Sequence, residues 1–364
     1  MNWYPLRLTT PAKPLVFGDH VIARRLGKRG IPDWGIGETW ECTDVDGDNG
    51  DVTNGSLAGT SLRDLVHRHP EELMGPGWSG DSFPVLTKFI DASGTLPVHV
   101  HADDATAQRL EGQRNGKTEA WHVLEAAPGA TALCGVRAGV TTEQLRAALQ
   151  AQDFDAVLRR LPVRAGETIY VPGGTPHSFG PDTLVYEIEQ TSNIQQHAMR
   201  WQMEDGSPVP DEEFAANIDA FVQEAKLDPK PDFVPGLAVR IGDGVERVVL
   251  TASPYFALER WRAGTAEPLR RSFATAQVLS NTGAPVQVRA GACTEELGRA
   301  ETLLLPAVLG EVEITGPADV LFGYLPDLTR DVVEPLVAAG YAPRVIATLG
   351  EGLEEAAATT TTST

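Results

Sequence analysis

The chain has 364 residues, which is too long for one ordinary core and fits two domains of roughly 150 residues or more. Its composition, 42% hydrophobic and 22% charged with 36 glycines and 26 prolines, excludes a fibrous or disordered chain and is typical of a soluble protein rich in turns. The 50 acidic and 30 basic residues give a formal charge of -20, which argues against nucleic acid and anionic membranes as partners. A small anionic substrate is compatible with this net charge, because a few cationic side chains in a cleft can attract it while salt screens the more distant acidic residues.

The cysteines and the N-terminus indicate where the protein works. Cys42, Cys134 and Cys293 are far apart and form no C-x-x-C spacing, which argues against both a disulfide framework and a thiolate metal site. The first residues lack the apolar core of a signal peptide, and no run of about 18 apolar residues predicts a membrane span. We therefore expect a cytoplasmic protein.

Short β-rich runs separated by turns fill the first half of the chain. They lie at residues 84–90, 96–101, 120–126, 130–136, 167–172 and 183–189. This spacing predicts an antiparallel sandwich or barrel. One helix interrupts the runs, because Thr141 and Gln144 form a capping box ahead of Leu145 and Leu149. Its apolar pattern resumes after a break at residues 154–158, and we expect the chain to return to the barrel at Pro162.

A second helix, over residues 211–227, precedes a segment of breakers that predicts a domain boundary near Pro235. Further strand-like runs follow at residues 246–252, 255–261, 276–282, 284–290, 301–307 and 312–316. The expected domains are a metal-binding domain with helical insertions, a metal-free β domain, and a helical extension whose last residues, 356–364, are disordered. These domains span residues 1–234, 235–326 and 327–364.

A candidate metal site lies in the first half, since all eight histidines lie at or before His197. His99 and His101 are two apart on a predicted strand, so their imidazoles project from the same face. Glu119 and His177 complete a pattern of H-x-H, Glu and G-x5-P-x-G-x2-H that fits the two cupin signatures. A barrel brings such distant ligands together, and three imidazoles with one carboxylate leave coordination positions open for catalysis.

Other histidines have simpler explanations. His67 and His69 share the H-x-H spacing but lie in a polar, helix-like stretch that ends at Pro70, where the rings diverge. His122 follows Trp121 and should point away from the face of Glu119. Trp40 and Trp121 lie among apolar residues and are expected to be core residues rather than platforms for a sugar.

The sequence also resembles a narrower family. The blocks at residues 35–42, 83–104, 116–124 and 161–180 are similar, in order, to those of the short bacterial type I phosphomannose isomerases. Residues 301–316 and 324–328 are similar to the family's second domain. The resemblance implies a mainly β fold of two cupin (jelly-roll β-barrel) domains with helical insertions. It also implies a metal-dependent isomerase that interconverts mannose 6-phosphate and fructose 6-phosphate by proton transfer between C2 and C1.

By this resemblance the ligands are His99, His101, Glu119 and His177. His99 stands where the family has Gln, which makes iron, manganese, nickel or cobalt alternatives to the expected zinc. Lys117 matches a family position implicated in acid-base work, and we expect the neighbouring cation to lower its pKa.

Glu187 is the second acid-base candidate that the resemblance implies. Asn193 and His197 occupy the positions of the family's Asp and active-site Arg. Arg200, three residues further on, is the candidate replacement, with Lys88 as another anion contact.

This departure leaves other functions open. One is isomerisation of an unphosphorylated or modified sugar, a second is a cupin dioxygenase with a three-His-one-Glu site, and a third is a sugar-binding protein without turnover. The expected partner is a small sugar or sugar phosphate, and the protein is expected to be a monomer or a homodimer.

Overall fold

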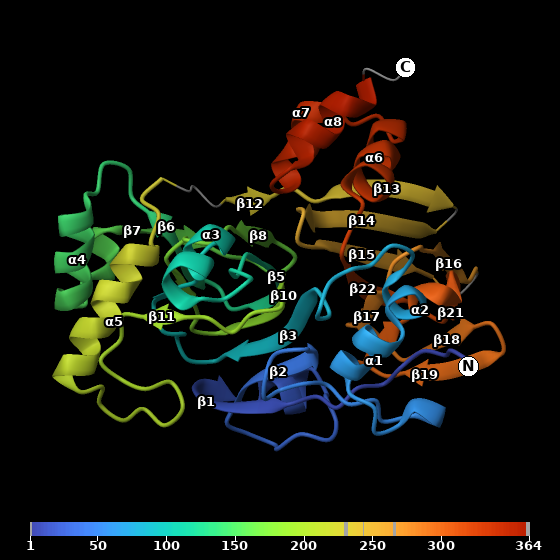
Figure 1. Ribbon diagram of the computed structural model, residues 1–364, viewed down its shortest axis with the longest axis horizontal. Coiled ribbons are helices and arrows are strands. Elements are labelled where there is room, and N and C mark those ends of the chain that lie inside the picture. The colour runs from blue at the N-terminus through green and yellow to red at the C-terminus, as the bar shows by residue number, and fades with distance from the viewer. Residues whose placement is uncertain (1, 229–231, 243, 265–266, 362–364) are drawn as a thin grey trace.

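A computed structural model of the chain describes residues 2–228, 232–242, 244–264 and 267–361. Two pairs of antiparallel sheets lie side by side along the long axis of the molecule (Figure 1). The predicted fold is confirmed: the protein is mainly β and contains two cupin barrels with helical insertions. Helices α4 (Thr142–Ala151) and α5 (Asp211–Glu224) flank the first barrel, and the C-terminal helices lie beside the second.

The first barrel is built from two sheets. Among the described residues, one sheet has the order β1 (Ala12–Asp19), β2 (Ile36–Cys42), β3 (Val85–Ala92), β10 (Thr183–Gln190), β5 (Glu119–Ala126), β8 (Thr168–Val171) and β12 (Phe233–Val234). The facing sheet has the order β11 (Gln196–His197), β4 (His99–Val100), β9 (His177–Phe179), β6 (Thr131–Val136) and β7 (Leu158–Pro162).

The second barrel has the same two-sheet construction. Its larger sheet has the order β13 (Leu237–Gly242), β14 (Val245–Ala252), β15 (Ala257–Ala263), β22 (Asp319–Tyr324), β17 (Gln277–Asn281) and β20 (Thr302–Leu305). The smaller sheet has the order β16 (Leu269–Ser272), β21 (Glu311–Thr315), β18 (Val286–Ala290) and β19 (Cys293–Leu297). Strand β12 lies in the first barrel and β13 in the second. We therefore propose the domain boundaries that the sequence predicts, at residues 234/235 and 326/327.

Strand β10 is buried on both faces because the second barrel covers its outer side. Glu187 and Glu189 project to the inner side, whereas the hydroxyl of Tyr186, on the outer side, lies 2.9 Å from that of Ser280 in β17. An added Cβ on Gly323 of β22 would lie 2.9 Å from a methyl of Ile188, so the two barrels pack closely here. The second barrel therefore supports the strand that carries two inward carboxylates.

The two predicted helices of the first half are present. In α4 the Thr141 hydroxyl accepts a hydrogen bond from the Gln144 amide, and the Gln144 side chain accepts one from Thr141, which confirms the capping box. Helix α5 buries Phe214 and Ile218 as predicted. One prediction was wrong: the chain returns to the barrel at Leu158, where β7 begins, because the residues after the break pair with β6 instead of extending the helix.

The C-terminal extension is helical. It contains η6 (Leu328–Val333), α6 (Glu334–Ala338), α7 (Pro343–Ile346), η7 (Ala347–Leu349) and α8 (Leu353–Thr361). The prediction of disorder was wrong for residues 356–361, which continue α8. Alanine favours the helix, and Leu353 and Ala357 bury their side chains in the core. The rest of the predicted tail, residues 362–364, lies outside the described residues.

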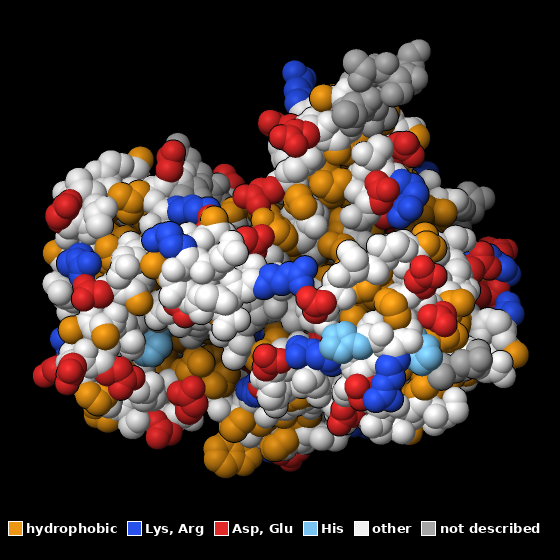
Figure 2. Space-filling model, viewed as in Figure 1, with side chains coloured by type: hydrophobic (Ala, Val, Ile, Leu, Met, Phe, Trp, Pro, Cys, Tyr) orange, Lys and Arg blue, Asp and Glu red, His pale blue; other side chains and the backbone are white. Residues whose placement is uncertain are grey.

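The remaining helices are short. They are η1 (Val21–Arg25), η2 (Gly55–Leu57), α1 (Leu62–Arg68), α2 (Pro70–Met74), α3 (Asp104–Thr106), η3 (Ala107–Glu111), η4 (Phe154–Ala156) and η5 (Ala307–Leu309). In the part of the chain that the structure describes, no helix combines the length and apolar character needed to cross a membrane. Acidic and basic side chains are interspersed on the face shown in Figure 2.

Candidate metal centre

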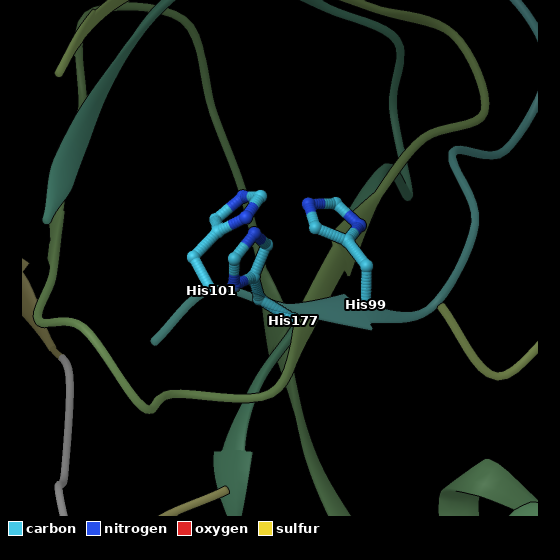
Figure 3. Close-up of side chains that lie close together, drawn as sticks. All are labelled: His99, His101 and His177. Carbon is cyan, nitrogen blue, oxygen red and sulfur yellow. The ribbon is translucent and has the colours of Figure 1, made fainter. Parts of the chain in front are cut away.

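Three of the four predicted ligands come from adjacent strands of the smaller sheet. His99 of β4 pairs directly with His177 of β9, and His101 follows β4 on the same face. The coordinating atoms of the three histidines lie within 4.8 Å of one another. Figure 3 shows the rings gathered around a common space. The H-x-H spacing and the pairing of β4 with β9 thus produce the convergence that the sequence predicts.

The second ring nitrogen of each histidine fixes the orientation of the first. The Nδ1 atoms of His99, His101 and His177 each lie 2.7 Å from a backbone carbonyl oxygen, those of Pro97, Ile194 and Thr175 respectively. A carbonyl only accepts, so each Nδ1 carries the hydrogen and each Nε2 keeps its lone pair. This is the arrangement typical of histidines that bind a metal through Nε2.

Glu119, the fourth predicted ligand, reaches the cluster from β5 in the facing sheet. Its Oε1 lies 3.1 Å from Nε2 of His177, and its Oε2 lies 3.4 Å from Nε2 of His101. Trp121 holds the carboxylate by donating a hydrogen bond of 2.8 Å to Oε1. Trp121 is buried as predicted, and it also contacts a predicted ligand.

The residues of this cluster fit a metal ion. Nε2 of His101, Nε2 of His177 and Oε2 of Glu119 are buried and have no hydrogen-bond partner among the described atoms. Leaving such acceptors unsatisfied is costly unless a cation binds them. Three neutral imidazoles and a carboxylate suit zinc and other divalent transition metals.

Protonation favours the same conclusion. Burial lowers the pKa of His99 well below its ordinary value, and the neighbouring histidines lower it further. Burial, together with Lys117, lowers the pKa of His101 to about 4. Although burial opposes ionisation of Glu119, His177, Lys117 and His101 hold its pKa well below the ordinary value. His99 and His101 are therefore neutral and Glu119 is charged at neutral pH, as metal ligands must be.

A chain of buried ion pairs extends from Glu119. Lys117 Nζ lies 3.4 Å from Oε2 of Glu119 and 2.9 Å from Oε2 of Glu189. Lys88 Nζ lies 3.2 Å from Oε1 of Glu189 and 3.3 Å from Glu187. Strand pairing places Glu187 opposite Lys88 and Glu189 opposite Glu119, so all these side chains share the inner face. The structure thus brings Lys117 and Glu187, the predicted acid-base residues, next to the candidate metal centre.

The ion pairs set the charge of these groups. Burial disfavours a charged Lys117, but Glu189, Glu119 and Glu187 together raise the pKa of this lysine. The lowered pKa that the sequence predicts for Lys117 depends on a bound metal ion and stays a prediction. Burial and Glu119 oppose ionisation of Glu187, yet Lys88 and Lys117 lower its pKa. The ammonium groups of Lys117 and Lys88 favour the charged form of Glu189, against the effect of its burial. Lys117 is therefore protonated and Glu187 ionised at neutral pH.

Two predicted anion contacts are engaged elsewhere. The side chain of Arg200 is 49% exposed, pairs with Asp211 of α5 and lies over the ring of Phe214, so the structure does not bring it to the cluster. Lys88 is 3% exposed and enclosed by Glu38, Glu187 and Glu189, which leaves it no free face for an anion.

His197, at the position of the family's arginine, lies next to the cluster. It pairs with His99 across β11 and β4, and the side chains of paired residues project from the same face of a sheet. Burial lowers the pKa of His197, which favours the neutral ring at neutral pH. The imidazole of His197 cannot form the paired hydrogen bonds to one phosphate group that an arginine at this position could form.

The other histidines lie apart from the cluster, as predicted. His67 bonds through Nε2 to the carbonyl of Asp81, and the ring of His69 lies edge-on to that of Trp3. His122 contacts the hydroxyl of Thr168 and, through Nε2, the guanidinium of Arg260 in the second barrel.

Sequence reasoning missed Glu189, although its signal is present. The alternation in Thr183–Gln190 places Glu187 and Glu189 on one face of a strand whose other residues are largely apolar. Two carboxylates on a buried face require counter-charges, so the alternation predicts buried cations nearby. Lys88 and Lys117 are those cations.

A hollow of about 800 Å³ elsewhere on the described surface is lined by Trp3, Tyr4 and residues of the β18–β19 hairpin, and none of the four predicted ligands lines it. The candidate metal centre is instead nearly closed, with its four predicted ligands at most 6% exposed.

Comparisons with known proteins agree with the motifs. The mannose-6-phosphate isomerase of Streptococcus mutans is 28% identical over 320 residues, which cover 87% of this chain and 97% of that protein. The crystal structure of the mannose 6-phosphate isomerase from Bacillus subtilis superposes with a TM-score of 0.79 at 24% identity, covering 88% of this chain and all of that chain. No family model matches the sequence.

A zinc-bound mannose 6-phosphate isomerase has the same fold. It superposes with a TM-score of 0.69 at 14% identity, over 88% of this chain and 99% of that chain. The resemblance predicted from the sequence motifs is therefore confirmed by named relatives and by solved structures of the same fold.

Proposed function

We propose that this protein is a zinc-dependent mannose-6-phosphate isomerase, which interconverts mannose 6-phosphate and fructose 6-phosphate. The observation that carries the proposal is the buried group of His99, His101, His177 and Glu119. In this group Nε2 of His101, Nε2 of His177 and Oε2 of Glu119 have no hydrogen-bond partner among the described atoms. Relatives named for this reaction, aligned over nearly nine-tenths of the chain, identify the reaction class.

In this proposal the four residues hold the ion. A bound zinc ion would act as a Lewis acid toward the sugar's carbonyl and hydroxyl oxygens. The three Nδ1 hydrogen bonds keep the imidazoles oriented with Nε2 toward it. The nearly closed surroundings exclude water, which strengthens each electrostatic interaction with a developing charge.

Glu187 and Lys117 have the charges that the proton transfer requires. Isomerisation removes a proton from C2 and delivers one to C1, and a carboxylate next to the reacting carbon suits both steps. Glu187 is ionised beside Lys88 and is the base in this proposal. Protonated Lys117 donates toward the oxygen on which negative charge develops.

A second candidate is the isomerisation of an unphosphorylated sugar, and the charge balance of the cluster favours it. The carboxylates of Glu119, Glu187 and Glu189, with that of the partly buried Glu38, face two lysines and a divalent ion, so the described cluster keeps no net positive charge for a phosphate. Arg200 is bound to Asp211 and so does not supply that charge.

The deciding experiment follows deuterium exchange. The metal-analysed protein is incubated in deuterated water with mannose 6-phosphate and, separately, with free mannose, while NMR records C2 deuteration and ketose formation. Exchange and ketose from the phosphosugar support the first proposal, and exchange from mannose alone supports the second. Absence of both in zinc-replete protein would exclude an isomerase and leave the dioxygenase or sugar-binding alternatives.

We also infer a cytoplasmic location and a monomer or homodimer. The thiols of Cys42, Cys134 and Cys293 are unpaired, as expected in a reducing compartment. Fractionation and light scattering test these two inferences.

A further inference from the structure

Glu189 is a fully buried carboxyl group to which the proposed reaction assigns no role. It lies directly opposite Glu119 in the pairing of β10 with β5, and its side chain is 0% exposed. The carboxylates of Glu119, Glu187 and Glu189 offer oxygens within 4.8 Å of one another. Like charges directly opposite on neighbouring strands destabilise a sheet. Something must therefore compensate for this arrangement.

Lys117 provides the compensation. Its ammonium lies between the two opposed carboxylates, 2.9 Å from Oε2 of Glu189 and 3.4 Å from Oε2 of Glu119. The shorter contact is to Glu189, so the lysine is held closer to that carboxylate than to Glu119. Oε2 of Glu119, which has no hydrogen-bond partner among the described atoms, is then left for a metal ion.

We propose that Glu189 is a positioning residue that keeps Lys117 from competing with the metal ion for Glu119. This inference rests on the metal centre of the proposed function. Without the charge of Glu189, Glu119 becomes the only carboxylate in the described contacts of Lys117. A full ion pair between the two would occupy the lone pairs that a metal requires and would move the ammonium away from the substrate.

The effect is specific to Lys117. Lys88 also contacts Glu189, through Oε1 at 3.2 Å, but keeps Glu38 and Glu187 when that contact is lost. Its ammonium also lies 4.9 Å from the centre of the Trp40 ring. Lys88 is therefore held by several partners, whereas Lys117 depends on Glu189 for its shorter contact.

The test is Glu189→Gln in the full-length chain, which keeps the shape and removes the charge. Zinc affinity is measured by competition with a chromophoric chelator, and the cobalt-substituted protein reports ligand geometry in its visible spectrum. We expect zinc to bind about 10–100-fold more weakly, as is typical when a partner of a metal ligand is lost. We also expect kcat to fall more than KM rises, and the cobalt bands to shift.

A matched control is Glu224→Gln. Glu224 is also a buried carboxyl, 2% exposed and without a hydrogen-bond partner among the described atoms, but it lies at the end of α5 outside the ion-pair chain. This variant should bind zinc like the wild type. An equal loss in both variants would overturn the proposal, because any buried carboxyl would then have the same effect.

Two further variants separate positioning from packing. Glu189→Asp keeps the charge and should recover most of the affinity. Lys117→Met combined with Glu189→Gln removes the competitor together with its anchor, so zinc affinity should return to nearly that of the wild type. Wild-type affinity in Glu189→Gln, or a double variant weaker than either single variant, would contradict the proposal. Because zinc binding is measured directly, a protein without isomerase activity refutes the proposed function and leaves this test intact.

Discussion

Each barrel contains a buried glutamate two residues before a tryptophan, and the two glutamates differ in their other hydrogen-bond partners. In the first barrel Trp121 donates to Glu119 at 2.8 Å, and in the second Trp261 donates to Glu259 at 2.7 Å. Nε2 of His101, Nε2 of His177 and Oε2 of Glu119 have no hydrogen-bond partner among the described atoms. Glu259 is instead saturated by two arginines and a tyrosine, Arg247, Arg271 and Tyr324.

The difference shows how one local motif gives a reactive or an inert centre. Arginine brings five donors and a permanent charge, so Arg271 neutralises Glu259 without a metal. Burial opposes ionisation, but Arg271 and Arg247 lower the pKa of Glu259 to about 2. Histidines bring lone pairs instead of fixed charge, and so leave Glu119 dependent on a cation. In the described part of the second barrel, ion pairs with arginine therefore occupy the place that the candidate metal centre occupies in the first.

The largest effect should come from removing a histidine ligand. In His101→Ala we expect loss of stoichiometric zinc and a fall in kcat/KM of at least about 10³-fold, because a metal contributes several kcal/mol to charge stabilisation. Elemental analysis and the exchange assay measure both quantities. His67→Ala, which removes a surface imidazole, serves as control and should keep zinc and activity. Full activity in zinc-free His101→Ala would refute the metal centre.

The matching change in the second barrel should affect stability instead. Glu259→Gln leaves Arg247 and Arg271 buried without their counter-charge, so we expect a loss of about 3–5 kcal/mol in the free energy of unfolding. The stabilisation by Glu259 is present above pH 4.5 and is lost as the pH falls toward its folded pKa of about 2. Urea titrations at neutral pH and at pH 3 measure it. Zinc content per folded molecule should stay unchanged, and zinc loss would show that the two centres are coupled.

The junction between the barrels should respond to acid in another range. Burial, aided by Arg260, lowers the pKa of His122 to about 3, so protonation favours the unfolded chain as the pH falls below 6.5. At pH 4 this costs the folded protein about 3 kcal/mol relative to pH 7. The His122→Gln variant does not lose this stability, because glutamine does not titrate. The stability difference between wild type and variant should therefore shift in favour of the variant on acidification, and a constant difference would contradict this.

The smallest effect is expected for Arg200→Ala. Its half-exposed pair with Asp211 contributes less than about 1 kcal/mol to the free energy of unfolding. Because the guanidinium lies over Phe214 on α5, kcat/KM for mannose 6-phosphate should change less than about twofold. Steady-state kinetics decide the matter. A rise of more than tenfold in KM would show that Arg200 reaches the substrate after all.

The sequence determined the parts of this protein that depend on short-range patterns. Alternating apolar residues predict the strands, Thr141 and Gln144 predict the start of α4, and the H-x-H spacing places two imidazoles on one face. The cupin signatures added Glu119 and His177. Short, irregular strands such as β9 and β11 had too few residues to give a pattern of their own.

Only the tertiary structure decided which charges meet. Lys88 and Glu189 come from β3 and β10, and Lys117 lies just before β5; the folded barrel joins them in one buried chain of ion pairs. Arg200 lies three residues from the position of the family's arginine, but in the folded chain its guanidinium pairs with Asp211 and lies over the ring of Phe214 in α5. Ion pairs across strands depend on register and burial. These are properties of the folded barrel, and residue spacing along one chain does not contain them.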